Sequence, residues 1–330
     1  MARRSRRSRV LSWIVWGLGV FAIVATILPL VPTDEGWVRV FDFPRLQLAV
    51  LAAANALAAA LVLDWRRRRI QAFLILLAAS FAYQALEIYP FTPLAPKEVA
   101  SAAGCQPDGR VSLLIANVLM ANRTSEPFLR MTRRLAPDLV LVTESDRWWD
   151  RQLESLAGSH PHAVRYPLDN TYGMHLYSRL PLLEPEVRFL VQDDVPSIHT
   201  RVRLRSGRLF DFYGVHPRPP RPARDTTPRD VELVVVGRQA AADARPTIVA
   251  GDLNDVGWSA TTRLFKEISG LLDPRVGRGV YATFNANWPF LRWPLDHVFV
   301  DGSFRLVRLQ RLGDIGSDHF PIFIETCRQP

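Results

Sequence analysis

The sequence predicts a layered α+β domain, built from two packed sheets with outer helices, that follows a membrane-spanning helical region. Two observations support this prediction. The first hundred residues are mostly Ala, Leu, Val and Ile in long charge-free runs, whereas the rest of the 330 residues alternates short apolar runs with turn residues. Mixed strands with interposed helices favour sheets that are covered by helices. The length suffices for one large domain or two small ones.

Three apolar runs near the N-terminus are long enough to cross a bilayer. After the basic opening MARRSRRSRV, 21 residues without a charge extend from Leu11 to Val31, and this length spans a hydrocarbon core of about 30 Å. An Ala-rich run and a third apolar run follow. The alternative is a signal peptide followed by two buried helices, but the first run lacks a clear cleavage site. We expect a membrane anchor over residues 1–91, with spans at about 11–31, 44–63 and 70–90.

The distribution of charge predicts the orientation of this anchor. Short Arg-rich segments stay on the cytoplasmic side, and both the N-terminal tail and Arg66–Arg69 are of this kind. Three spans then place everything after residue 100 outside the cytoplasm of a multi-pass cell-membrane protein. Residues 1–100 hold 12 Lys/Arg and 6 Asp/Glu, whereas residues 101–330 hold 29 and 26. The basic excess therefore fits membrane topology better than a nucleic-acid-binding face.

The two cysteines, Cys105 and Cys327, flank the soluble domain. In an oxidising compartment they would form one disulfide, and in the cytosol they would remain free thiols. The sequence leaves both alternatives open because it does not give the Cα separation that a disulfide requires.

The soluble part alternates predicted strands and helices. Residues 92–110 have the composition of a polar linker, and residues 111–327 form the folded domain. Apolar runs and period-two alternation predict strands at 111–117, 139–144, 174–178, 198–204, 208–216, 246–252, 295–300 and 319–325. Helical spacing predicts helices at 125–136, 147–156 and 229–243.

Polar side chains stand repeatedly at or just beyond the ends of these strands. One such ending is ordinary, since Asp and Asn are common in turns. So many in one domain indicate loops that a rigid scaffold brings together into a site. The candidates are Asn117, Glu144, His216, Asp252, Asn254, Asp296, Asp318 and His319.

These residue types predict metal-assisted phosphoryl transfer. Glu144 is a hard oxygen ligand and Asn117 adds a neutral oxygen, a pair that suits Mg²⁺, with Mn²⁺ as the alternative. No Ser, Cys or Thr nucleophile and no zinc motif stands out, so water is the simplest nucleophile. His319 suits a general-base or charge-stabilising role, and Asp318 orients it or another group. His216 suits a leaving-group acid or a phosphate ligand.

Seven stretches in sequence order resemble the endonuclease/exonuclease/phosphatase superfamily, which has the DNase I-like fold. They are LLIANVL (113–119), PDLVLVTE (137–144), YGMHLYSRLPL (172–182), FYGVHPRPP (212–220), IVAGDLND (248–255), WPLDHVFV (293–300) and GSDHFPI (316–322). The resemblance covers residues 111–325 and implies a four-layered α/β sandwich with the site at one edge of two packed sheets.

The resemblance also implies roles for individual residues. Asn117 and Glu144 match the metal-site pair of the family, and His216 matches its catalytic histidine. Asp252 and Asn254 match the pair that orients the attacking water and contacts phosphate. Asp296, Asp318 and His319 match the acidic and Asp-His positions of the last two motifs.

The sequence gives less reason to place the remaining histidines and arginines in the site. His297 follows Asp296 in a strand and therefore points to the opposite face, which favours a structural role. His175 and His199 lie inside strands, where packing or surface roles are expected. The arginines of residues 217–228 fit either an anionic substrate or a solvated loop.

The sequence thus predicts a Mg²⁺-dependent phosphodiesterase or phosphatase that is anchored in the bilayer and acts on a lipid head group or another phosphoester. An extracytoplasmic nuclease is the first alternative. A non-catalytic membrane-tethered binding module is the second, and the presence of Glu144, Asp252 and His319 argues against it.

Overall fold

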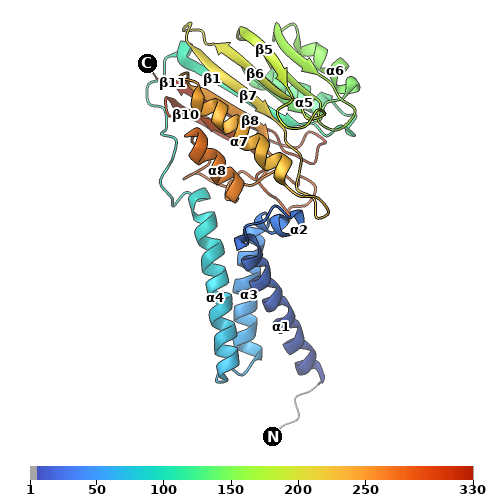
Figure 1. Ribbon diagram of the computed structural model, residues 1–330, viewed down its shortest axis with the longest axis vertical. Coiled ribbons are helices and arrows are strands. Elements are labelled where there is room, and N and C mark those ends of the chain that lie inside the picture. Colours follow the sequence, from blue (N-terminus) through green and yellow to red (C-terminus); the bar gives the residue numbers. More distant parts are fainter. Residues whose placement is uncertain (1–5, 330) are drawn as a thin grey trace. The chain divides into compact units, whose positions relative to one another are not determined.

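The structure is a computed structural model that describes residues 6–329 and divides into two compact units (Figure 1). The first, here called the membrane unit after the spans that its sequence predicts, contains the residues up to Pro90 together with Arg221–Asp225. The second, here called the catalytic unit after the function that its sequence predicts, contains Phe91–Pro220 and the residues from Thr226 onward. Each unit has its own apolar core.

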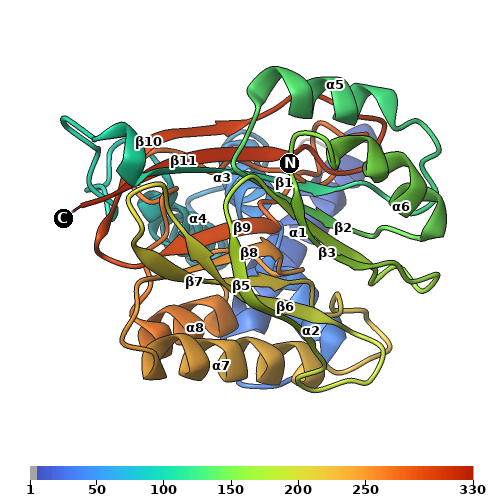
Figure 2. The ribbon, with the colours of Figure 1, turned by 90° about the horizontal axis from the view of Figure 1, so that it is seen from above.

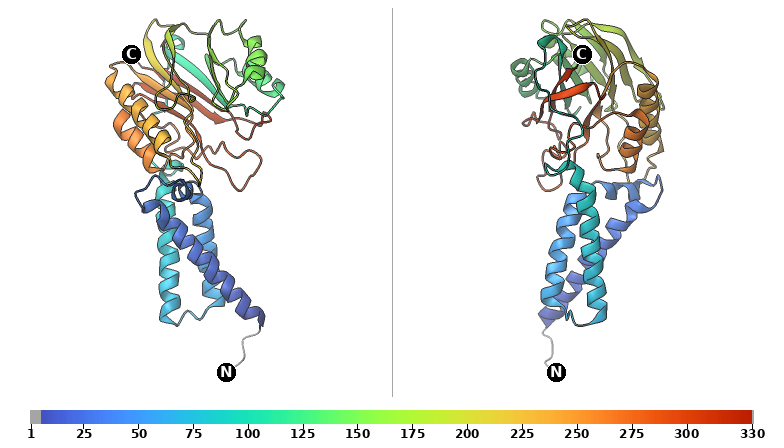
Figure 3. Two further views of the ribbon diagram at one scale, coloured as in Figure 1. Left: turned by 45° about the vertical axis from the view of Figure 1, so that its right-hand side comes forward. Right: turned by 90° about the vertical axis from the view of Figure 1, so that its left-hand side faces the viewer.

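Three helices of the membrane unit are long and apolar enough to cross a membrane. They are α1 (Arg6–Ile27), α3 (Arg45–Val62) and α4 (Arg68–Ile88), and the short α2 (Gly36–Arg39) lies between the first two in sequence (Figure 3). Trp16 of α1 stacks on Phe73 of α4 with ring centroids 4.2 Å apart. Their outward faces carry large apolar side chains such as Leu61 and Ile75, as lipid-facing helices do.

A buried polar cluster joins the ends of these helices. Arg45, which is 1 % exposed, pairs with Asp42 at 2.9 Å and donates to Gln84 Oε1 at 3.3 Å. Gln84 in turn donates to Thr26 at 3.0 Å. Hydrogen bonds between helices fix their mutual register where apolar packing alone does not.

The catalytic unit contains two mixed sheets, which confirms the predicted fold class. The first has the strand order β10-β11-β1-β2-β4-β3 and the second has the order β5-β6-β7-β8-β9. The strands are β1 (Arg110–Asn117), β2 (Leu139–Thr143), β3 (His162–Tyr166), β4 (Met174–Ser178), β5 (Leu182–Arg188), β6 (Ser197–Arg203), β7 (Leu209–Val215), β8 (Thr247–Asp252), β9 (Asp296–Val300), β10 (Phe304–Arg311) and β11 (Ile322–Arg328). Among the strands named here, only β1/β2 and β7/β8 pair in parallel.

Helices cover the outer face of each sheet and complete four layers (Figure 2). Helices α5 (Glu126–Leu135) and α6 (Arg147–Leu153) bury Phe128 and Trp149 against the first sheet. Helices α7 (Thr227–Ala242) and α8 (Ala260–Ser269) bury Leu233 and Phe265 against the second. The two inner faces meet in the main core, where burial of side chains such as Leu141 and Phe212 stabilises the fold.

The strands absent from the sequence prediction share a position in the fold, and helix α8 (Ala260–Ser269) was not predicted either. The strands β3, β5 and β10 were not predicted, and all three lie at sheet edges. Edge strands carry charged residues and Pro. These residues interrupted the alternation of apolar and polar side chains from which strands were predicted. The last strand begins at Ile322, three residues later than expected, because Pro321 has no N–H to donate to a ladder.

The segment expected to be a polar linker packs on the catalytic unit. Val99 is fully buried in the main core. Ala102 N–H donates to Leu306 O at 2.8 Å, which fastens the segment beside β10. Cys105 and Cys327 form a disulfide, with Cα atoms 6.0 Å apart. Of the two alternatives for these cysteines, the structure has the disulfide.

A buried carboxyl group on α7 makes the stability of the unit depend on pH. Glu232 is 1 % exposed and accepts one hydrogen bond, from Ser197 Oγ at 3.2 Å. Burial raises the pKa of Glu232 from 4.5 to about 8, and the Ser197 hydrogen bond opposes this only in part. The folded carboxyl stays protonated between these values whereas the unfolded one ionises, so stability falls as the pH rises through this window.

We therefore expect Glu232→Gln to stabilise the protein at pH 7 by about 2–4 kcal/mol. Thermal unfolding of the full chain in detergent at pH 7 and pH 4 measures the effect. At pH 4 both states of the wild type are protonated, so the gain should vanish. An equal gain at both pH values would contradict the ionisation account.

Candidate active site

The two parallel strand pairs bring the candidate residues to one edge of the sheets. Asn117 ends β1 and Glu144 follows β2, its parallel neighbour in the first sheet. In the second sheet, His216 follows β7 and Asp252 ends the parallel β8. Asp296 opens the antiparallel β9 directly opposite Asp252. Strand geometry thus explains why residues far apart in sequence meet.

Asn117 connects the two sheets at this edge. Its Nδ2 donates to Glu144 Oε1 at 2.8 Å and to Asp252 Oδ2 at 3.0 Å. Its Oδ1 accepts from Leu119 N–H at 3.0 Å, which fixes the orientation of the amide. Asn117 therefore holds two carboxylates at a set separation.

The backbone conformation of Glu144 and the burial of its carboxylate are both unfavourable in free energy. Its φ is +56°, a left-handed conformation that a side chain rarely adopts. Burial raises the pKa of Glu144 to about 7; the hydrogen bond from Asn117 opposes this and the charge of Asp252 adds to it. A bound cation would favour the ionised carboxylate. Strain of this kind gathers at functional sites, where surrounding structure maintains it.

His319 forms a buried ion pair with two carboxylates. Its Nδ1 lies 2.8 Å from Asp296 Oδ2, and its Nε2 lies 3.6 Å from Asp252 Oδ2. Burial alone would lower the pKa of His319, but the charges of Asp296 and Asp252 outweigh it and raise the pKa to about 10. His319 is therefore an imidazolium at neutral pH.

Asp318 does not orient His319. Its side chain is half-buried and lies 3.5 Å from Ser317 Oγ, whereas Asp296 occupies Nδ1 of His319. Orientation of a different group by Asp318 stays a prediction. The charge of Asp318 still acts on both Glu144 and His319.

His216 faces Asp252 from the other side. Its Nε2 lies 3.7 Å from Asp252 Oδ2, and its ring lies 5.4 Å from that of Tyr172. Burial lowers the pKa of His216, although the charge of Asp252 opposes this. His216 is therefore neutral at physiological pH. Burial also raises the pKa of Asp252, against the charge of His319.

Asn254 lies at the edge of this group. Its Nδ2 donates to Pro217 O at 2.9 Å, and its N–H donates to Asp252 Oδ1 at 3.0 Å. Its φ of +50° turns the chain sharply after β8. Gly251 precedes the turn, and a Cβ there would overlap Val215 O, so only glycine permits this approach of β8 to β7.

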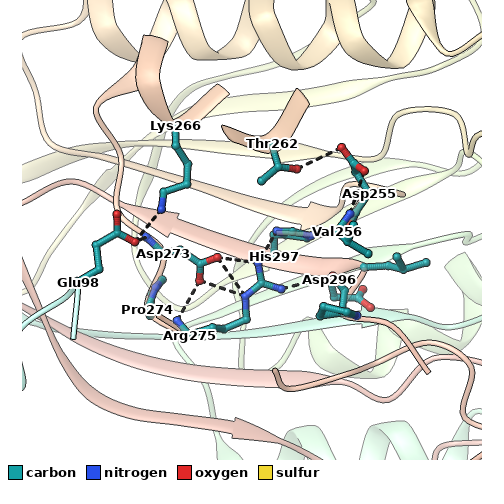
Figure 4. Close-up of polar contacts among 12 residues, drawn as sticks. Glu98, Asp255, Val256, Thr262, Lys266, Asp273, Pro274, Arg275, Asp296 and His297 are labelled. Carbon is teal, nitrogen blue, oxygen red and sulfur yellow. Dashed lines mark hydrogen bonds and ion pairs between the residues drawn. The ribbon is translucent and has the colours of Figure 1, made fainter. Parts of the chain in front are cut away.

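A buried ionic network supports the site from behind (Figure 4). Arg275 pairs with Asp273 at 2.7 Å and donates to His297 Nδ1 at 2.6 Å. His297 then donates from Nε2 to Asp255 O at 2.8 Å. Burial and the charge of Arg275 lower the pKa of His297 to about 3, so it stays neutral. His297 thus contacts Arg275 and Asp255 rather than Asp296, as the predicted structural role requires.

A second support, not predicted from the sequence, lies behind Glu144. Ser145 Oγ contacts His175 Nδ1 at 2.7 Å, and His175 Nε2 contacts Asp150 Oδ1 at 2.7 Å. Ser145 is fully buried, so it is not a nucleophile. This series of hydrogen bonds instead fixes the position of Ser145, the residue that follows Glu144. No local sequence signal reveals it, because its members come from different elements.

The residues fit a hard divalent cation. Asp252, Asp296 and His319 offer potential ligand atoms within 4.8 Å of one another, and Asn117 bonds to both Asp252 and Glu144 and so connects this cluster to Glu144. Asp296 Oδ1 is buried and has no hydrogen-bond partner among residues 6–329. Because His319 is cationic, the carboxylates are the suitable donors. Oxygen ligands of this kind suit Mg²⁺ and Mn²⁺.

The family follows from comparison with known proteins. The profile of the Endonuclease/Exonuclease/phosphatase family matches residues 114–319, and the chain belongs to this family. Members of the family are divalent-metal-dependent phosphoester hydrolases. No curated protein matches the sequence.

Solved structures share the fold at low sequence identity. D. rerio TDP2 complexed with single strand DNA product is 19 % identical, with a TM-score of 0.54 over 66 % of this chain and 99 % of that one. The human Nocturnin catalytic domain with bound sulfate is 16 % identical, with a TM-score of 0.56 over 68 % and 97 %. An endonuclease/exonuclease/phosphatase from Beutenbergia cavernae is 16 % identical, with a TM-score of 0.55 over 66 % and 72 %.

From the network shown in Figure 4, we expect that replacing Arg275 lowers the stability of the protein strongly. Arg275→Met would leave the fully buried Asp273 without its partner, at an expected loss of about 3–5 kcal/mol. Denaturation of the full chain measures this loss. The double variant Asp273→Leu/Arg275→Met removes both charges and should regain much of the stability. A double variant as unstable as the single one would contradict the account.

Proposed function

We propose that this protein is a membrane-anchored phosphoesterase whose catalytic unit lies outside the cytoplasm. It hydrolyses a phosphoester with water as the nucleophile and Mg²⁺ as the metal, or Mn²⁺ in its place. One observation carries the proposal: the strand ends of both sheets converge on the contact between Asn117, Glu144 and Asp252, with His319 beside them.

The bound cation would polarise the phosphoryl group and neutralise developing charge. Asn254 positions the attacking water, and Asp252 accepts its proton as the new bond to phosphorus forms. The P–O bond to the leaving group breaks, and the leaving oxygen takes a proton from solvent. The imidazolium of His319 stabilises the charge on the phosphoryl oxygens, and Asp296 keeps it protonated. Its raised pKa argues against a general-base role. Neutral His216 hydrogen-bonds a phosphoryl oxygen, since its lowered pKa makes it a poor acid source at neutral pH.

Three features support membrane anchoring with an external catalytic unit. Three helices have the length and composition of spans. The Arg-rich segments at the N-terminus and at Arg66–Arg69 fit the cytoplasmic side. The Cys105–Cys327 disulfide fits an oxidising compartment.

We favour a lipid head group or another envelope phosphoester as the substrate. An anchored enzyme meets such substrates at high effective concentration. An extracytoplasmic nuclease is the second candidate, because one similar structure is a TDP2 complexed with a DNA product. Residues 101–330 hold 29 Lys/Arg and 26 Asp/Glu, a small excess for binding that depends on phosphate neutralisation.

The first test is turnover by the full chain in detergent on phospholipids, nucleic acids and small phosphoesters. We expect activity that chelation abolishes and Mg²⁺ or Mn²⁺ restores. His319→Asn should lower kcat by about 10²–10⁴-fold, because it removes the cation that stabilises transition-state charge. Glu144→Ala should lower turnover and raise the metal concentration that is needed.

The matched control is His162→Ala, which removes a histidine of β3 outside the site. It should retain wild-type turnover. Near wild-type activity of His319→Asn on every substrate that the wild type hydrolyses would refute the mechanism. Absence of turnover by a folded wild type on the whole panel would favour the non-catalytic binding module.

The second test concerns the compartment. We expect Cys105 and Cys327 in purified full chain to resist alkylation until a reductant is added, because the disulfide leaves no free thiol. In intact cells or spheroplasts, a protease added outside should cleave the catalytic unit. Free thiols together with protection from the protease would place the unit in the cytoplasm.

A further inference from the structure

A loop beside the site exposes an unusual concentration of apolar surface. In residues 285–292, here called the aromatic loop, Trp288 is 63 % exposed, Phe290 85 % and Leu291 47 %. Among the described residues of the catalytic unit, Phe189 is the one other exposed large aromatic side chain, at 40 %. A concentrated apolar patch on a folded protein indicates an interaction surface.

The base of the aromatic loop forms a wall of the candidate active site. The ring of Phe284 lies 5.0 Å from that of His319. Ala286 N–H donates to Asp318 O at 2.7 Å, and Asp296 N–H donates to Thr283 Oγ1 at 3.2 Å. Whatever the loop tip binds is therefore held close to the reacting groups.

The tip is exposed on a well-bonded turn. Asn285 N–H donates to Leu291 O at 3.3 Å, and Leu291 N–H donates to Trp288 O at 3.1 Å. The side chain of Arg292 closes the loop through hydrogen bonds to Asn285 O at 3.1 Å and Ala286 O at 2.9 Å. The apolar side chains are thus presented in a preorganised conformation, which reduces the entropic cost of binding.

The chemistry of the loop matches a lipid surface. The stretch FNANWPFLRWP (284–294) has no Asp or Glu. Behind the tip, the guanidinium groups of Arg292 and Arg311 lie 4.9 and 4.5 Å from the Phe320 ring. Exposed Trp and Phe beside Arg, without acidic residues, is the composition of membrane-interface segments.

We propose that the aromatic loop inserts into the bilayer surface and presents lipid-borne phosphoesters to the active site. This inference rests on the proposed function, which it narrows to substrates embedded in the membrane. The bilayer is the occupant that we favour, because the same chain carries three apolar helices of spanning length. The membrane unit itself and a second copy of the chain are the competing occupants.

Insertion is tested with a fluorescent label on the full chain. Cys105 and Cys327 are bonded to each other, so Phe290→Cys supplies one reactive thiol for an environment-sensitive dye. In vesicles of phosphatidylethanolamine and phosphatidylglycerol, we expect quenching by spin-labelled lipid and protection from aqueous iodide. Leu264→Cys, at an exposed position of α8, is the control that should show the reverse. Quenching of the label at 290 by iodide, or protection from both quenchers, would overturn the proposal.

Delivery of substrate is tested by kinetics. Trp288→Ala/Phe290→Ala should lower turnover of phosphatidylglycerol in vesicles by at least about tenfold, because less apolar area enters the interface. Turnover of the soluble bis(p-nitrophenyl) phosphate should stay within about twofold, since the loop tip makes no contribution there. The matched control Val231→Ala/Leu264→Ala removes exposed apolar side chains from α7 and α8 and should change neither rate.

The two proposals fail in different ways. Equal losses on both substrates, or no loss on either, would overturn the role of the loop while leaving the enzyme intact. If the wild type hydrolyses soluble phosphoesters alone, the lipid substrate class is wrong. If the wild type hydrolyses neither, the proposed function fails, and the label at position 290 still decides whether the loop enters the bilayer.

Discussion

The buried pairing of His319 with Asp296 and Asp252 is the interaction on which the site depends. Removing charges from water costs several kcal/mol per ion unless partners compensate. One imidazolium balances only part of the negative charge, because Glu144 stands beside the same group. This surplus of negative charge would attract a divalent cation. Burial and the neighbouring carboxylates together raise the pKa values of both Glu144 and Asp252.

The fold makes this concentration of charge possible through its two parallel strand pairs. Each pair delivers two polar residues to one edge, and Asn117 joins the two edges by bonding to carboxylates on both sheets. Glu144 adopts a left-handed backbone conformation directly after β2, and Asn254 adopts one two residues after the end of β8. Such conformations persist because rigid neighbours impose them. The Arg275–His297–Asp255 network is one of these neighbours, and it holds the loop after β8 from the side away from the site.

The sequence predicts the parts of the molecule whose signal is local. Apolar interior strands and the polar residues at their ends were identified, whereas the charged edge strands β3, β5 and β10 were not. Contacts between residues that are far apart in the sequence were harder to predict. Asp318 adjoins His319 in sequence, yet Asp296 binds it, because β9 and the loop before β11 meet only in the fold. The high exposure of Phe290 could not be predicted either, because a sequence does not show which of its apolar side chains are buried in the fold.

The disulfide between Cys105 and Cys327 turns most of the catalytic unit into a closed ring, because 222 positions separate the two residues. Cys327 lies in β11, the strand that pairs with β1 at the start of the sheet. A mechanical pull on the segment before Cys105 is therefore carried across a covalent bond to the far end of the chain. The hydrogen bonds between β1 and β11 are spared that load. Tension on the residues next to Cys105 reaches β1 and β11 from the same end of the pair, where Arg110 lies opposite Cys327, and therefore does not unzip it.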